Sequence, residues 1–225
     1  MSGLSPPNSG KSAVFAGQID SVGPVSAPDS GPEIGTASVD WTTELADQLD
    51  WHWRNQLRPR LDGLTGEEYF WEPVPGMWSV RPRGSSVTPM SLGGGNFTVD
   101  FARPAPDPPP VTTIAWRVCH LIGAVIGRRV GWHFGGEPVD VAAYDYPGDV
   151  ATALAQLDAL YAAWLAGVRG LDAVGLASPC GPAEGRFAGY PMAALILNIN
   201  REVIHHGAEI ALLRDLYRWQ VPATD

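Results

Sequence analysis

Apolar side chains recur every three or four residues in four separate stretches of this chain. In the first stretch they stand four positions apart, at Leu45, Leu49, Trp53, Leu57 and Leu61. An α-helix completes a turn every 3.6 residues, so this spacing places them all on one helical face. No stretch shows the convincing alternation of apolar and polar residues that a half-buried strand requires. The pattern predicts an all-α protein, a four-helix bundle.

Residues that begin or bend helices refine these predictions. Thr42 or Thr43 can cap the first helix, and Pro59 should kink or end it. The threonine pair after the proline run suits the start of the second helix, and Pro147 suits the first turn of the third. The helices are therefore expected near residues 42–62, 112–134, 148–170 and 191–218.

Two parts of the chain lack an apolar helical period. Residues 1–40 are rich in Ser, Gly and Pro, which predicts a disordered N-terminal tail ahead of a bundle domain at 41–220. Residues 64–111 form a long loop between helices 1 and 2. Its first part is aromatic and should fold over the bundle, with at most a short extended piece at residues 78–81.

Charge and cysteine content exclude several classes of protein. Twenty-four acidic residues against fifteen basic ones give a net charge of −9, which repels phosphate backbones, so nucleic acid is not an expected partner. No run of about 18 apolar residues and no secretory signal is seen, so no membrane partner is expected. The two cysteines, Cys119 and Cys180, do not form a disulfide framework, which favours the cytoplasm.

The fourth predicted helix carries the clearest chemical signal. Glu202 and His206 are four residues apart, so both project from the apolar face that also bears Val203. A buried carboxylate and imidazole are costly unless they are paired or bind a cation. His120 lies in the second helix beside Leu121 and can supply a third ligand from a facing helix. Two histidines and one glutamate would leave a metal with open positions.

A plainer interpretation uses the same residues without a metal. His120 would be a core histidine bonded to a carbonyl group, and Glu202 with His206 an ion-paired helical turn. His205 is the main rival ligand, but it is turned about 100° from His206 around the helix. His52 is expected at a solvated or rim position, and His133 is expected to have no functional role.

Taken together, these motifs resemble the DinB-like superfamily over roughly residues 41–218. The resemblance rests on the Trp-Ser-Val-Arg-Pro run at 78–82, on His120, and on the run from Glu202 through His206 to Gly-Ala-Glu. Most members carry three histidines, whereas here Glu202 replaces the middle one. This variant resembles the branch that includes mycothiol-dependent maleylpyruvate isomerase, whose triad is His, Glu, His.

The resemblance implies a site, a cofactor and a topology. The metal ligands would be His120, Glu202 and His206, and the cofactor a divalent metal, with zinc favoured over nickel. The helix order would be up-down-down-up, so helices two and three run parallel. The segment 136–147, which would have to cross between them, is short for that purpose.

The resemblance also implies a reaction class. A low-molecular-weight, mycothiol-like thiol would be the cosubstrate, because a metal with an open position deprotonates a bound thiol. The expected function is S-transfer or isomerisation, with a metal-dependent hydrolase or a non-catalytic, stress-associated metal-binding module as alternatives. Arg81, Arg117 and Arg128 are candidates to anchor a carboxylate of the thiol. The expected partners are a small-molecule thiol or electrophile, and a homodimer is an alternative to a monomer.

Overall fold

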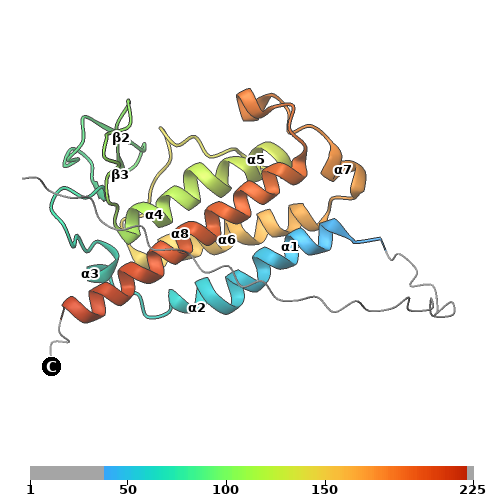
Figure 1. Cartoon of the computed structure of the whole chain (residues 1–225). Coiled ribbons are helices and arrows are strands. Elements are labelled where there is room, and N and C mark those ends of the chain that lie inside the picture. Colours follow the sequence, from blue (N-terminus) through green and yellow to red (C-terminus); the bar gives the residue numbers. More distant parts are fainter. Residues whose placement is uncertain (1–37, 222–225) are drawn as a thin grey trace, which may run out of the picture. The chain divides into compact units, whose positions relative to one another are not determined.

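The computed structural model describes residues 38–221, which are mostly helical (Figure 1). The predicted tail, residues 1–40, lies outside this part except for residues 38–40. Long helical segments lie where the apolar stripes predicted them. In chain order they are α1 (Trp41–His52) with η1 (Trp53–Leu57) and α2 (Arg58–Arg60), α4 (Ile114–His120) with η2 (Leu121–Gly127) and α5 (Arg128–Phe134), α6 (Val150–Arg169), and α8 (Met192–Gln220). The short helices are α3 (Gly66–Tyr69), α7 (Ala173–Ala177) and η3 (Pro182–Phe187).

Side-chain contacts define the directions of the long segments. Phe134, at the end of α5, packs against Trp164 near the end of α6, so these two segments run parallel. Asn200, in the first half of α8, donates to the carbonyl of Leu45 near the start of α1, so α1 and α8 also run parallel. Figure 1 shows that the two pairs run in opposite directions. The bundle is thus up-down-down-up.

Parallel neighbours require the chain to cross the length of the bundle between α5 and α6. The second helical segment, 114–134, is about 30 Å long at 1.5 Å per residue. The connection at 135–149 can span about 50 Å when extended, because extended backbone rises more than twice as far per residue as a helix. The crossover that appeared short for its task is therefore long enough.

Glycines on the second helical segment let this crossover lie close to the helix. A Cβ atom at Gly123 would stand 2.6 Å from the hydroxyl oxygen of Tyr146, and one at Gly131 would stand 2.3 Å from the Cα of Pro138. Side chains at these positions would push the crossover away. Because the backbone approaches so closely, Tyr146 is buried and becomes part of the core.

The connection between the first two helical segments contains a small sheet. Strands β1 (Val80–Pro82), β2 (Met90–Leu92) and β3 (Phe97–Phe101) are antiparallel, in the order β1-β3-β2. Val99 pairs with Val80 on one side and with Leu92 on the other. The predicted extended piece near residues 78–81 overlaps β1, but the expectation of at most one such piece was wrong. Strands of three to five residues are too short to show a clear alternation.

A buried carboxylate, Asp100, ties this connection together. It accepts hydrogen bonds from the backbone N–H of Ser79 at 2.9 Å and of Val87 at 3.2 Å. It also accepts from Arg81 Nε at 2.8 Å and from the Ser86 hydroxyl at 2.6 Å. A buried charge needs such partners, and here they come from several points of one otherwise irregular segment. The connection is therefore an ordered unit packed on the bundle.

Two helix starts differ from the prediction. Asp40 caps α1, accepting from the N–H groups of Thr42 at 3.1 Å and Thr43 at 3.3 Å, so neither threonine is the cap. Asp149 caps α6, which leaves Pro147 outside the helix. In both cases an aspartate, one of the residues most favoured at this position, takes up free N–H groups of the first turn.

Helix α6 is long and apolar enough to span a membrane by length and composition, a feature that the sequence analysis did not anticipate. In the structure it is a bundle helix. Trp164 is fully buried, Tyr161 stacks on Trp53 with ring centroids 3.9 Å apart, and Asp158 accepts from Arg58 at 2.9 Å. Core helices of water-soluble proteins share this composition, so the feature alone is weak evidence for a span.

Candidate metal centre

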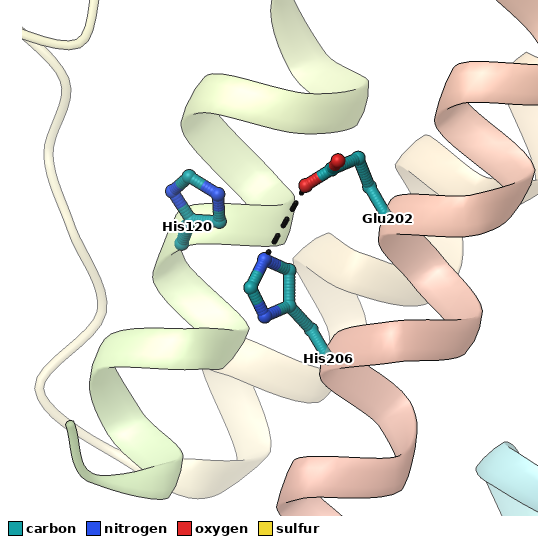
Figure 2. Close-up of side chains that lie close together, drawn as sticks. All are labelled: His120, Glu202 and His206. Atoms are coloured by element: carbon teal, nitrogen blue, oxygen red, sulfur yellow. Dashed lines mark ion pairs between the residues drawn. The ribbon is translucent and has the colours of Figure 1, made fainter. Parts of the chain in front are cut away.

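The three predicted ligands come together between two helices (Figure 2). His120 is the last residue of α4, and Glu202 and His206 are one turn apart in α8. The rings of His120 and His206 meet edge to face with centroids 4.9 Å apart, and His206 Nε2 lies 3.5 Å from Glu202 Oε2. One candidate ligand atom from each residue lies within 4.8 Å of the other two. The structure therefore brings all three side chains to one point.

This donor set fits a divalent cation. Ligand atoms around a tetrahedral zinc ion lie about 3.4 Å apart, because each bond is about 2.1 Å long, so small side-chain rotations suffice. The carboxylate of Glu202 supplies the negative charge that a buried cation requires. Within residues 38–221 no arginine or lysine pairs with Glu202; its ionic contact is with His206. The charge of this carboxylate is therefore available to an ion.

Glu209 orients His206 from the side away from the other ligands. Its Oε2 lies 2.7 Å from His206 Nδ1, and Arg117 pairs with the same carboxylate. With the proton on Nδ1 and donated to Glu209, Nε2 presents its lone pair toward Glu202. No role for Glu209 was predicted from the sequence. Its position three residues after His206, on the same helical face, was the available signal.

The small sheet supports His120 through Trp116. The indole ring of Trp116 stacks on the imidazole of His120, with centroids 4.9 Å apart and an interplanar angle of 12°. The indole N–H donates to the carbonyl oxygen of Asp100 in β3 at 2.9 Å. Burial and the neighbouring His206 lower the pKa of His120 to about 3, so its imidazole is neutral, as a metal ligand must be. The π-helical stretch η2 begins directly after His120, and such stretches are frequent at functional sites.

His205 lies outside this group, as its helical angle predicted. Its side chain is exposed, and its Nε2 lies 3.3 Å from Glu209 Oε1. His205, His206 and Glu209 form a second group with ligand atoms within 4.8 Å. However, the guanidinium of Arg117 already pairs with Glu209 and lies 3.3 Å from His206 Nδ1. A positive charge therefore occupies the place that a second cation would take.

The side chains of the other two histidines are buried, contrary to the expectation for His52. Only 8% of His52 is exposed, and its Nδ1 lies 2.9 Å from the side-chain oxygen of Gln56. His133 contacts Glu184 at 3.0 Å, and Arg129 donates two hydrogen bonds to the same carboxylate. Both histidines pack between elements of the bundle and lie apart from the three converging ligands.

Neither cysteine can act as a ready nucleophile. Cys119 is fully buried beside Tyr69, whose hydroxyl lies 3.8 Å from the thiol, and burial raises the pKa of Cys119 to about 12. Burial also raises the pKa of Cys180. Thiolates, not thiols, are the reactive forms, so burial disfavours the reactive form of both side chains. Any thiol chemistry at this site would need a thiol from outside the chain.

The three candidate arginine anchors are placed differently. Arg117 stands beside the three candidate ligands, where it pairs with Glu209. Arg81 instead forms ion pairs with Asp100 and with Glu72, each at 2.8 Å. Arg128 lies over the ring of Trp132, 5.7 Å from its centroid. Of the three, Arg117 is the one that the structure places in contact with a residue bonded to His206.

Comparison with known proteins adds one finding. The profile of the DinB superfamily matches residues 95–210, more than half of the chain. The matched range begins just before β3 and extends into α8, so it includes His120, Glu202 and His206. No curated protein and no solved structure matches the chain.

Proposed function

The chain belongs to the DinB superfamily, and from this premise we propose that it is a metal-dependent enzyme whose cation is held by His120, Glu202 and His206. The observation that carries the proposal is the convergence of two imidazoles and a carboxylate that no guanidinium neutralises within residues 38–221. Zinc suits this mixture of nitrogen and oxygen donors, and nickel is the second candidate.

The number of ligands favours catalysis over a structural role. Structural zinc sites are closed by four protein ligands, whereas catalytic sites have three and keep an open position. A divalent cation with an open position lowers the pKa of a thiol or a water molecule that binds to it. The chain would supply the geometry: Glu209 holds the ring of His206, and Trp116 holds the ring of His120.

We favour a low-molecular-weight, mycothiol-like thiol as the cosubstrate, in an S-transfer or isomerisation reaction. Support comes from the Glu202 variant of the triad and from the burial of Cys119 and Cys180, which leaves the thiol to an outside molecule. A metal-dependent hydrolase and a metal-binding module without turnover are the alternatives. Three further expectations stay predictions: a cytoplasmic location, the lack of nucleic-acid and membrane partners, and a homodimer as an alternative to a monomer.

The first test is metal binding. The full-length protein is stripped with a chelator and titrated with zinc and with nickel by calorimetry, and the metal content of the untreated protein is measured by elemental analysis. One ion per chain is expected. An absence of binding for every divalent ion tried would overturn the proposal, and Glu202 with His206 would then be an ion-paired turn.

The second test is turnover. The zinc-loaded protein is incubated with a panel of low-molecular-weight thiols and 1-chloro-2,4-dinitrobenzene, and thioether formation is followed by absorbance. In this reaction a carbon–sulfur bond forms, the carbon–chlorine bond breaks, chloride leaves, and the thiol proton passes to solvent. Cys119→Ala removes one of the chain's two thiols and should be as active as the wild type. Hydrolysis of an ester panel without thiol transfer would favour the hydrolase, and metal binding without either activity the non-catalytic module.

A further inference from the structure

A cavity of about 250 Å³ lies between the second helical segment and α8. It is enclosed by α5, by the first turns of α8, and by the segment that includes η3. The residues that matter for its chemistry are Arg129, Glu184, Phe187, Tyr190, Asn198 and Arg201. Pockets for drug-sized ligands typically hold about 300–1,000 Å³, so this cavity suits a molecule of about one ring.

The cavity and the three ligands lie along the same pair of helical segments. Asn198 and Leu195, which line the cavity, precede Glu202 by four and seven residues, so they lie on its face of α8, one and two turns away. One turn is about 5.4 Å along the helix axis. Arg129 lines the opposite wall from α5, which continues the helical segment of His120. The cavity therefore lies about one to two turns of α8 from Glu202.

The two arginines that line the cavity differ in whether a carboxylate neutralises them. Both oxygens of Glu184 accept from Arg129, at 3.1 Å and 3.2 Å, which neutralises that guanidinium. Arg201 is exposed and donates to the uncharged side-chain oxygen of Asn198. Among residues 38–221 no carboxylate pairs with Arg201. A protein of net charge −9 therefore presents an unneutralised positive group at this opening, which attracts small anions.

The outer wall is aromatic. Phe187 and Tyr190 are 47% and 56% exposed, and they contact each other edge to face with centroids 5.7 Å apart. The guanidinium of Arg186 lies over the Phe187 ring, 4.7 Å from its centroid. Aromatic side chains of this kind offer a planar ligand flat or edge contacts. Ring and charge recognition are therefore combined in one cavity.

We propose that this cavity binds small planar aromatic carboxylates, with Arg201 holding the carboxylate and Phe187 and Tyr190 contacting the ring. Its use as the site of the electrophile rests on the proposed function, whereas the binding itself does not. In the resulting reaction the sulfur of the outside thiol attacks the ring carbon that carries a leaving group such as chloride. The carbon–sulfur bond forms, chloride departs with the bonding pair, and the thiol proton passes to solvent.

Binding is tested with two probes that lack a leaving group. The full-length protein, with and without zinc, is titrated calorimetrically with 3,5-dinitrobenzoate and with neutral 1,3-dinitrobenzene. The benzoate should bind about tenfold more tightly, because a charge-assisted hydrogen bond to an exposed arginine contributes about that factor. Arg201→Gln should lose this advantage, and Arg201→Lys should keep part of it. Arg218→Gln removes the same charge from an exposed site farther along α8 and should bind like the wild type.

Equal affinity for the two probes would overturn the inference, as would unchanged benzoate binding in Arg201→Gln, or an equal loss in Arg218→Gln. Turnover separates this inference from the proposed function. The kcat/KM for 4-chloro-3,5-dinitrobenzoate is divided by that for 1-chloro-2,4-dinitrobenzene, with the same thiol, in the wild type and in Arg201→Gln. If this ratio is the same in both proteins, the cavity inference fails and the metal-dependent enzyme stands. If the benzoate binds through Arg201 but no metal binds, the metal-dependent enzyme fails and the cavity stands.

Discussion

Two clusters of histidine and glutamate lie along the second helical segment, and different groups surround the two carboxylates. In the first cluster Glu184 accepts two hydrogen bonds from Arg129 and contacts His133 at 3.0 Å. The side chains of Glu184 and His133 are only 4% and 5% exposed. The guanidinium supplies the positive charge that this buried carboxylate needs, so the cluster is complete without a ligand.

In the second cluster the guanidinium pairs with an outer carboxylate and not with the one between the histidines. Arg117 pairs with Glu209, the residue behind His206, while Glu202 faces the imidazoles of His206 and His120. The inner carboxylate therefore lacks a fixed positive partner in the described part of the chain. A histidine near a glutamate is therefore not enough to indicate a metal site. Whether an arginine neutralises the carboxylate distinguishes an internal ion cluster from a place for a metal.

Loss of a ligand from the second cluster should have the largest effect. His206→Ala should weaken zinc binding by more than about a hundredfold, because loss of a mere supporting residue already costs about 10- to 100-fold. His205→Ala, which removes the exposed neighbouring ring, should leave the affinity nearly unchanged. Calorimetric titration with zinc measures both. Equal losses of zinc affinity in the two variants would show that the ligands have been assigned to the wrong face of α8.

Removal of the central carboxylate should change the free energy of unfolding in the first cluster and hardly at all in the second. Glu184→Gln should lower the free energy of unfolding by about 3 kcal/mol, because it leaves the partly buried Arg129 charge unpaired. Glu202→Gln in metal-free protein should change it little, since no arginine depends on Glu202 within residues 38–221. Urea denaturation in the presence of a chelator gives both values. A similar loss in both variants would mean that the second cluster is also an internal ion cluster.

The supporting carboxylate of the second cluster should have an intermediate effect. Glu209→Gln should weaken zinc binding about tenfold, because the carboxylate fixes the tautomer and orientation of His206. Asp215→Asn is the matched control, since this carboxylate lies farther along α8 and pairs with Arg60. Its zinc affinity should equal that of the wild type. An unchanged affinity in Glu209→Gln would remove Glu209 from the site.

The smallest effect concerns acid. Burial opposes ionisation of Glu184, but the bonds from Arg129 and His133 outweigh it, so the pKa of Glu184 lies below its ordinary value of 4.5. A lowered folded-state pKa stabilises the protein above pH 4.5, and this contribution disappears as the pH falls through the lower, folded-state pKa. The stability difference between the wild type and Glu184→Gln should therefore shrink on acidification. Urea denaturation on both sides of pH 4.5 tests this, and a difference that grew in acid would contradict it.

Much of the fold could be predicted because its signals are local. A stripe such as Leu45, Leu49 and Leu57 determines a helix and its buried face without reference to the rest of the chain. The small sheet could not be predicted in this way. Its strands are too short for an alternating pattern, and they depend on Asp100, whose partners Ser79 and Val87 lie 21 and 13 residues before it. Such a hub has no period that a sequence pattern could show.

The candidate site divides along the same line. Helical spacing was enough to predict that Glu202 and His206 share a face and that His205 does not, because residues four apart on a helix lie one turn above each other. The packing of the helices is what brings His120 to them, and what pairs Arg117 with Glu209 while Glu202 stays unneutralised within residues 38–221. Helical spacing defines angles around one axis. Which faces of two helices meet, and which charges then come together, depends on how the whole core packs.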